Sequence, residues 1–373
     1  MKRAITLLLT LTIILSTVLV PVAFADDDDD HEGYKVKETK HYVYTIVDGK
    51  AIIGYYKGKQ STVKIPSKLG GKPVVEFGRQ LDVWDAMWDI GLRDNKYVKK
   101  IVFPKSVKEI NMCSVFRNKN LESVTIKGAT FIGESAFEDC TKLKKISLPA
   151  CLKTIKPCAF SNTALSGKFT IGKNIKEFDA SAIEDTKINR FSVVKGNKRF
   201  STKSGVLYNK NKTKLIAYPC DKKLKTFKTI KKTKTIAALS FYGTKNLKTI
   251  IYSPNIQVVE DCSMEYCSQL EKMVFKSKNK LTISEVAFDD LKKLNKVLFK
   301  TKEEITIGNR AFLGCTSLKC ITIPKKVVSI GKKAFGYKSY SKKIKCFTIK
   351  GYKGTAAEKY AKKNGFKFIA LDK

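Results

Sequence analysis

The chain has 373 residues and a formal net charge of +39, because 73 lysines and arginines outnumber 34 aspartates and glutamates. Only seven of the basic residues are arginine, the side chain that best reads phosphates and bases. The composition therefore argues against a specific nucleic-acid-binding protein. The lysine excess predicts either a solvated basic face or attraction to anionic polymers, such as those of a cell wall.

The first residues have the pattern of a secretory signal peptide, assigned to residues 1–25. Lys2 and Arg3 precede an apolar run from Ile5 to Val20, and the motif Ala23-Phe24-Ala25 follows. We expect cleavage after Ala25, which leaves a secreted chain with a formal charge of +37 and no transmembrane segment. An uncleaved membrane anchor is the alternative.

The next two segments precede any repeat. Residues 26–41 begin with five aspartates and predict an acidic, disordered stretch that lacks the ligand spacing of a calcium loop. Residues 42–97 hold several glycines between short β-rich pieces, which indicates hairpins that form an N-terminal β cap. An insert within this cap, from Arg79 to Tyr97, places four apolar residues at helical spacing: Leu81, Trp84, Trp88 and Leu92.

From residue 98 to residue 343 one phrase recurs, a short apolar alternation followed by Ile and then Ala-Phe. Neighbouring copies lie about 21 to 24 residues apart, which is typical of a solenoid. A short strand cannot bury its apolar side alone, so each copy must pack on the next. We expect a right-handed solenoid of mostly short parallel β-strands and turns. The Phe position recurs at Phe116, Phe137, Phe160, Phe241, Phe288, Phe312 and Phe335, with Ile183 and Met264 replacing it in two other copies.

The regular copies are interrupted at residues 196–225. Here Gly205–Tyr208 and Lys214–Tyr218 flank four polar residues, which predicts a hairpin that projects from one side of the stack. Residues 344–373 predict a C-terminal cap. In this cap Thr355 begins a short helix, Gly365 ends it, and the apolar residues that follow supply a closing strand.

The repeats resemble those of a known family. Ile321–Phe335 and Ile132–Leu143 are similar to the BspA-type leucine-rich repeats of bacterial secreted and surface proteins, and Val47–Tyr55 and Gly351–Ala361 resemble that family's end segments. The resemblance covers nearly all of the mature chain. It implies a leucine-rich-repeat solenoid that acts as a non-catalytic scaffold, without a cofactor. It also implies adhesion or binding to host proteins, matrix or neighbouring cells.

The ten cysteines of an exported chain would ordinarily suggest disulfides. However, Cys140, Cys267 and Cys315 each stand three residues after the Phe position, a slot that should face the interior, where a thiol acts as a small apolar group. The spacing would also allow Cys262 to pair with Cys267, and Cys315 with Cys320. No Cys-x-x-Cys motif with a nearby histidine predicts a zinc site, so we expect no metal.

Candidate catalytic groups are sparse. The two histidines, His31 and His41, both precede the repeats, so we expect no Ser-His or Cys-His pair. Carboxylates stand at turns of separate copies, where solvated caps are expected rather than a catalytic pair: Glu134, Asp139, Asp289 and Asp290. The sequence therefore predicts a protein that is not an enzyme.

The strands offer a better candidate for binding. Residues two and four after each leading apolar residue should point outward. Three consecutive copies then place Ile251, Val274 and Leu298 beside Lys272 and Lys296, an apolar stripe with a basic border that is typical of a protein contact. Ordinary β-propensity is the alternative explanation. The first column is Lys100, Ser123, Lys145, Arg190, Thr249, Lys272, Lys296 and Cys320, and the second is Val102, Thr125, Ser147, Ser192, Ile251, Val274, Leu298 and Thr322.

Trp84 and Trp88 are the second candidate. They are the only tryptophans, and Asp82, Asp85 and Asp89 surround them in the sequence. Such a group can stack on a sugar ring or grip a cationic segment, or it can simply cover the end of the stack. Two further functions therefore remain open. One is a polysaccharide-binding accessory protein, and the other is a cell-wall-associated spacer.

Overall fold

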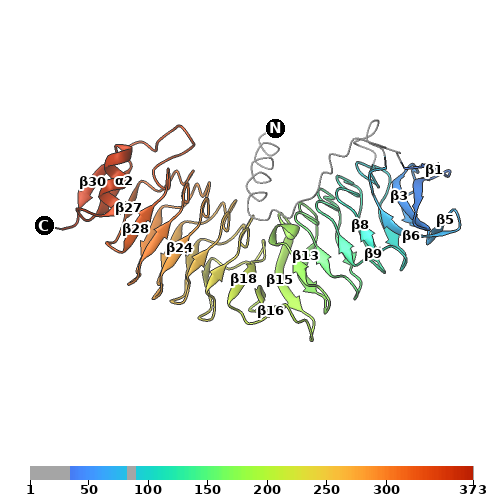
Figure 1. Ribbon diagram of the computed structural model, residues 1–373, viewed down its shortest axis with the longest axis horizontal. Helices are drawn as coiled ribbons and strands as arrows, with labels where there is room; N and C mark the ends of the chain where they lie inside the picture. Colours follow the sequence, from blue (N-terminus) through green and yellow to red (C-terminus); the bar gives the residue numbers. More distant parts are fainter. Residues whose placement is uncertain (1–33, 82–89, 373) are drawn as a thin grey trace. The chain divides into compact units, whose positions relative to one another are not determined.

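The computed structural model describes residues 34–81 and 90–372, and residues 35–373 form one compact unit. Figure 1 shows this unit as a succession of coils that follow one another in sequence order, each contributing short strands to ladders that run from coil to coil. This is the leucine-rich-repeat solenoid that the repeat predicts. In the described residues one α-helix occurs, α2 (Ala356–Asn364), near the C-terminal end. No described helix is long and apolar enough to cross a membrane.

One set of ladders, here called the strand strip, is built from the apolar alternations. Its pairings are parallel and run in the orders β4-β7-β9-β11, β13-β15, β19-β21-β23-β25 and β27-β29-β30. Residues of equal rank in neighbouring coils lie opposite one another, so side chains form columns. The strands are β4 (Thr62–Lys64), β7 (Lys100–Phe103), β9 (Ser123–Ile126), β11 (Lys145–Ser147), β13 (Ser166–Ile171), β15 (Lys187–Val193), β19 (Thr226–Lys228), β21 (Thr249–Ile251), β23 (Lys272–Phe275), β25 (Lys296–Phe299), β27 (Cys320–Thr322), β29 (Thr348–Gly351) and β30 (Lys367–Ala370).

A second set of ladders contains the short strands that precede each Ala-Phe turn. Its two sheets have the orders β1-β2-β3-β6-β8-β10-β12-β14, with β5 paired to β6, and β16-β17-β18-β20-β22-β24-β26-β28. The strands of the first sheet are β1 (Lys37–Glu38), β2 (Tyr42–Val47), β3 (Lys50–Tyr56), β5 (Lys68–Leu69), β6 (Lys72–Phe77), β8 (Glu109–Ile110), β10 (Phe131–Ile132), β12 (Thr154–Ile155) and β14 (Glu177–Phe178). Those of the second are β16 (Phe200–Lys203), β17 (Val206–Asn209), β18 (Lys214–Ala217), β20 (Thr235–Ile236), β22 (Val258–Val259), β24 (Leu281–Ile283), β26 (Ile305–Ile307) and β28 (Val327–Ile330).

The N-terminal end is closed by antiparallel hairpins, as its glycines indicate. Strands β2 and β3 are joined by Asp48 and Gly49, both with positive φ (48° and 68°), which is the conformation of a tight hairpin turn. Strand β3 then pairs in parallel with β6, and β6 with β8 of the first regular coil. The cap thus converts an antiparallel hairpin into the parallel ladder of the repeats.

The Ala-Phe turns are also a ladder. The backbone N–H groups of Ser135, Phe137 and Asp139 donate to carbonyls of the next coil at 3.0, 2.9 and 3.0 Å. Ser135 and Asp139 have positive φ (53° and 60°), and this alternation turns successive N–H groups toward the same neighbour. A left-handed conformation costs a non-glycine residue about 1–2 kcal/mol, which the coil-to-coil hydrogen bonds offset. Gly243 and Gly314 occupy the position of Asp139 in other coils without that cost.

The side chains at the Phe position stack along the interior. Phe312 and Phe335 have ring centroids 4.7 Å apart at 20°, and both rings are buried. The prediction is wrong at Phe116. The backbone N–H of Val115 makes the inter-coil bond that Phe137 makes in the next coil, so Val115 holds the interior position. Phe116 is displaced to a half-buried site, where the guanidinium groups of Arg93 and Arg117 lie 5.1 and 4.9 Å from its ring centroid.

The hairpin at residues 196–225 does not project from the stack. Leu207 of β17 belongs to the core cluster of the first half, while Val206 and Tyr208 on its other face belong to that of the second half. Strand β18 pairs in parallel with β20, so the hairpin starts the second sheet. Both faces of the hairpin are therefore buried, and it forms a wall between two cores. The alternation of apolar residues gave no sign of which faces would be covered.

Helix α2 closes the C-terminal end as predicted. Thr355 stands at its N-cap, although its hydroxyl bonds to the carbonyl of Tyr352 instead of capping the helix, and Gly365 ends the helix with φ 62°. The Tyr360 ring lies at 90° to Phe335, the last ring of the stack. Its hydroxyl accepts from the N–H of Phe335 at 2.9 Å and donates to the carbonyl of Phe335 at 2.8 Å. The phenol of Tyr360 thus makes the hydrogen bonds to Phe335 that the backbone of a following coil would otherwise make.

We expect Tyr360→Phe to lower the free energy of unfolding by about 1–3 kcal/mol, because both polar backbone groups of the buried Phe335 lose their partner. Tyr352→Phe is the matched control, since it removes a phenol oxygen that makes no hydrogen bond in the described structure. Urea unfolding of both variants measures the effect. Equal stability of the two variants would show that the hydroxyl does not cap the stack.

Candidate binding surface on the strand strip

The structure brings the five predicted binding residues together on β21, β23 and β25. Ile251, Val274 and Leu298 lie opposite one another in register, and Lys272 lies opposite Lys296. Because side chains alternate along a strand, the intervening residues of these strands point into the core. The predicted adjacency follows from this register.

The predicted exposure is wrong for Val274. Its side chain is only 6% exposed, whereas Ile251 and Leu298 are half-buried. Val274 lies on the middle strand, so an in-register apolar neighbour about 4.8 Å away covers it on each side. The apolar stripe, defined as Ile251, Val274 and Leu298, therefore presents its two outer members to solvent.

A further lysine, which was not predicted from the sequence, stands at the end of the apolar stripe, in the same column. Lys228 of β19 lies opposite Ile251, and it is exposed. The basic border is accordingly Lys228, Lys272 and Lys296, and none of these ammonium groups makes an ion pair or hydrogen bond within the described structure. The repeat starting at Phe227 follows the hairpin, where the sequence period is interrupted, so its residues could not be assigned to a column.

The tryptophan candidate lies outside the described residues, since these exclude both Trp84 and Trp88. Leu81 and Leu92, which share the predicted helical face, are both buried. His31 also lies outside the described part. His41 belongs to the N-terminal cap, where its ring centroid is 6.1 Å from that of Tyr56.

A row of carboxylates forms at the Ala-Phe turns, one residue after the Phe position. Glu138, Glu184, Glu265 and Asp289 occupy this position in four coils. Burial, with Asp185 and Glu138 nearby, raises the pKa of Glu184 to about 8. Burial and the neighbouring Asp289 raise the pKa of Glu265 to about 7. Stacked coils thus align like charges on an otherwise basic protein.

The expectation of solvated carboxylates at these turns is wrong for Asp289. Burial, together with the charge of Asp290, raises its pKa to about 7. Glu265 is buried further, at 5% exposed, and its Oε2 atom has no hydrogen-bond partner. Among the described residues, no three histidine, cysteine or acidic side chains converge on a point where a metal ion would bind. The row is consequently a set of partly buried carboxyl groups that belong to different coils and do not form a common metal site in the described structure.

The cysteines at the predicted interior slot are buried. The thiols of Cys140, Cys267 and Cys315 donate to carbonyls of the preceding coil at 3.1, 3.0 and 3.3 Å. Burial raises the pKa of Cys140 and of Cys267 to about 12, which keeps them as unreactive thiols at neutral pH. All ten cysteines are free in the structure, so the two pairings that the spacing would allow are not formed.

We expect Glu265→Gln to stabilise the protein in a pH-dependent way. A folded-state pKa near 7 lies above that of an unfolded glutamate, so the native state holds the extra proton and loses stability as pH rises from about 4.5 to 7. Gln mimics the protonated form. The free energy of unfolding should rise by about 1–3 kcal/mol at pH 8 and change little at pH 5. Glu303→Gln, at an exposed site, is the control, and an equal gain at both pH values would contradict this account.

Two solved structures are similar to this chain, and the first of them shares its architecture. The pneumococcal vaccine antigen PcpA superposes with a TM-score of 0.62 at 20% identity, covering 91% of this chain and 99% of that chain. A leucine-rich cell surface protein from Faecalibacterium prausnitzii gives a TM-score of 0.46 at 18% identity, and the match covers 87% of this chain and 89% of that chain. At such identities the first likeness shows the fold alone. No curated protein matches the chain.

The family assignment comes from the repeats themselves. A family model described as the BspA-type leucine-rich repeat region matches residues 93–213 and 216–345 in six copies. The gap between the two ranges falls at the start of β18, and together the ranges cover more than half of the sequence. The matched copies are the coils whose strands build the ladders. The chain therefore belongs to the BspA-type leucine-rich repeat family.

Proposed function

We propose that this chain, a non-enzymatic leucine-rich-repeat scaffold, is exported and binds a protein partner outside the cell through the apolar stripe and its basic border. The observation that carries the proposal is the in-register row of Ile251, Val274 and Leu298 beside unpaired lysines. Adhesion to host proteins, matrix or neighbouring cells is the role that this surface would serve.

The surface suits a protein partner for three reasons. Its parallel strands are held by neighbouring coils, so binding requires little ordering of the scaffold. The outer members Ile251 and Leu298 supply exposed apolar area, and the buried Val274 lies between them, so the apolar surface is not interrupted by a polar residue. No aromatic side chain appears in either outward column that the sequence defines, which disfavours stacking on sugar rings.

The basic border determines the chemistry of the partner. Lys228, Lys272 and Lys296 lie beside the stripe without carboxylate partners in the described structure, so a complementary surface would place acidic residues around an apolar centre. Such rim charges mainly raise the association rate and select the partner, whereas apolar contacts determine how slowly the complex dissociates.

Export is supported by the sequence pattern of residues 1–25, which lie outside the described part of the chain. Surface and secreted proteins are also where this repeat family is typically found. Anionic wall polymers would then be a second, purely electrostatic attraction for a chain of this charge.

We expect Ile251→Ser and Leu298→Ser each to weaken partner binding about tenfold while leaving the melting temperature nearly unchanged, because both side chains are half-exposed. Val102→Ser is the matched control, since Val102 occupies the same column on β7 and is also half-buried. Val274 is left intact because its burial makes a polar substitution destabilising. Candidate partners are host matrix proteins and mucin, tested by pull-down and then by surface plasmon resonance.

A salt series separates this binding from wall retention by charge. Specific capture of one protein should survive about 0.5 M salt, where electrostatic attraction between exposed charges is largely screened. Retention only on the producing cell's walls, lost as salt rises, would contradict the proposal and favour a wall-associated spacer. Capture that is unchanged in both serine variants would place the binding surface elsewhere.

A further inference from the structure

The strand strip has an opening between β15 and β19. Strand β15 pairs with β13, and β19 begins the next ladder, so no strand pairs with the second edge of β15 in the described structure. Two single hydrogen bonds bridge this edge instead. The N–H of Phe191 donates to the carbonyl of Gly205 at 2.8 Å, and the N–H of Asp221 donates to that of Ile188 at 2.9 Å.

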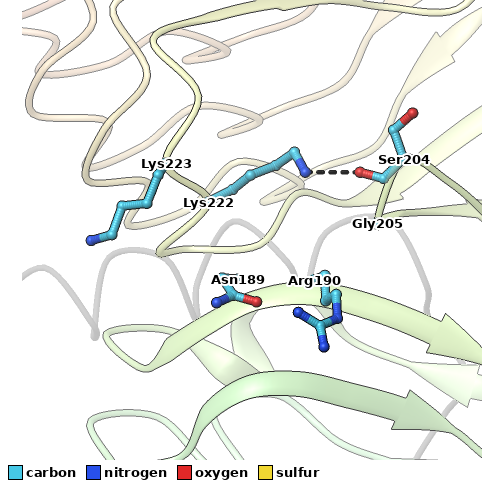
Figure 2. Close-up of a pocket in the computed structure, with 6 residues that line it drawn as sticks. All are labelled: Asn189, Arg190, Ser204, Gly205, Lys222 and Lys223. Carbon is cyan, nitrogen blue, oxygen red and sulfur yellow. Dashed lines mark hydrogen bonds between the residues drawn. The ribbon is translucent and has the colours of Figure 1, made fainter.

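A hollow of about 330 Å³ lies where these two bridges leave the edge uncovered. Figure 2 shows the residues that line it. Asn189 and Arg190 come from β15, Lys222 and Lys223 from the loop after β18, and Ser204 and Gly205 from the turn between β16 and β17. Its size is at the lower end of the range for small-ligand sites, about 300–1,000 Å³.

Gly205 is required for this geometry. Ser204 and Gly205 both have positive φ (53° and 76°) in the two-residue turn of the hairpin. A Cβ atom on Gly205 would lie 2.8 Å from the Cβ of Arg190, which is closer than side chains approach. The missing side chain thus lets the turn approach β15 while Arg190 keeps its place on the wall of the hollow.

Three of the residues that line the hollow are basic, and no lining residue is acidic. The guanidinium of Arg190 makes no hydrogen bond or ion pair in the described part of the chain. Lys222 Nζ donates to the carbonyl of Ser204 at 2.8 Å, and burial lowers the pKa of its ammonium group. Lys223 makes an ion pair, with its Nζ 2.6 Å from Oδ1 of Asp221, which lies outside the lining.

The donors favour a particular ligand chemistry. Guanidinium and ammonium groups have only N–H donors, and the fork of Arg190 matches two oxygens of one oxyanion. The amide of Asn189 and the hydroxyl of Ser204 add neutral polar groups beside them. A tetrahedral oxyanion, with oxygens in several directions, can reach donors on opposite walls where a planar carboxylate reaches fewer.

The charge continues outside the hollow. A register shift between Gly167 and Lys168 places Lys168 opposite Arg190 on the adjacent strand. Lys168 is exposed. A ligand anchored at Arg190 could therefore extend to a lysine on the neighbouring coil, as a polymer with repeated anionic groups would.

We propose that this hollow binds a phosphate or sulfate group carried on a polymer, with Arg190 as the main ligand and Lys222 as the second. The site lies apart from the apolar stripe and does not depend on the protein-binding role proposed above. The hollow would be a specific anion-binding site, in addition to the non-specific attraction that the net positive charge of the chain exerts on anions.

Isothermal titration calorimetry with inorganic phosphate and sulfate, at constant ionic strength, tests the hollow directly. We expect a single site with a roughly millimolar dissociation constant and weaker binding of acetate. Arg190→Gln should weaken phosphate binding about tenfold, and Arg190→Lys should restore only part of it because the paired donor geometry is lost. Lys145→Gln is the matched control, since it removes one charge from the same outward column without touching the hollow.

Melting temperatures verify that each variant is folded. The proposal would be overturned if Lys145→Gln and Arg190→Gln weakened binding equally, or if acetate and phosphate bound with equal affinity. Either result would mean that the overall positive charge of the protein attracts the anion. Absence of any single-site phosphate or sulfate binding would overturn it outright. Polyphosphate and a sulfated glycan then identify the source of the group. Either polymer should bind more tightly than its ion, and loss of that binding in Arg190→Gln supports the proposal.

Discussion

The hydrogen bond from one coil to the next is the constraint on which this structure depends. Strands of two to seven residues cannot satisfy their own backbone, so each coil completes its neighbour, even at the Ala-Phe turns where Ser135 and Asp139 accept left-handed conformations. Such a stack has no natural end. The antiparallel hairpin β2–β3 begins it, and the phenol of Tyr360 ends it by meeting both backbone groups of Phe335.

The same stacking controls the surface. A residue type repeated at one rank of the repeat becomes a column with a spacing of about 4.8 Å. Apolar residues at an outward rank therefore merge into a stripe, lysines merge into a border, and carboxylates one residue after the Phe position merge into a row with raised pKa values at Glu265 and Asp289. The chemistry that this surface presents to a partner consequently depends on which residues fall at equal rank.

The regular coils could be predicted from the sequence because their period fixes register, and register fixed the contacts of Ile251, Val274 and Leu298. Exposure could not be predicted in the same way, because burial of Val274 depends on both neighbouring coils at once. Local departures were also invisible. Val115 holds the interior position expected for Phe116, since at this coil the apolar pair is shifted by one residue.

The interruption of the period had the least predictable consequence, because alternation alone does not say how many faces of a hairpin are buried. Leu207 packs into one core and Val206 and Tyr208 into the other, so the hairpin joins two stacks that share no continuous strand ladder in the described part of the chain. Among the described residues, two backbone hydrogen bonds bridge this edge of β15. A continuous ladder would fill that space with another strand, so a concave, cation-lined site on this scaffold can form where the repeat fails.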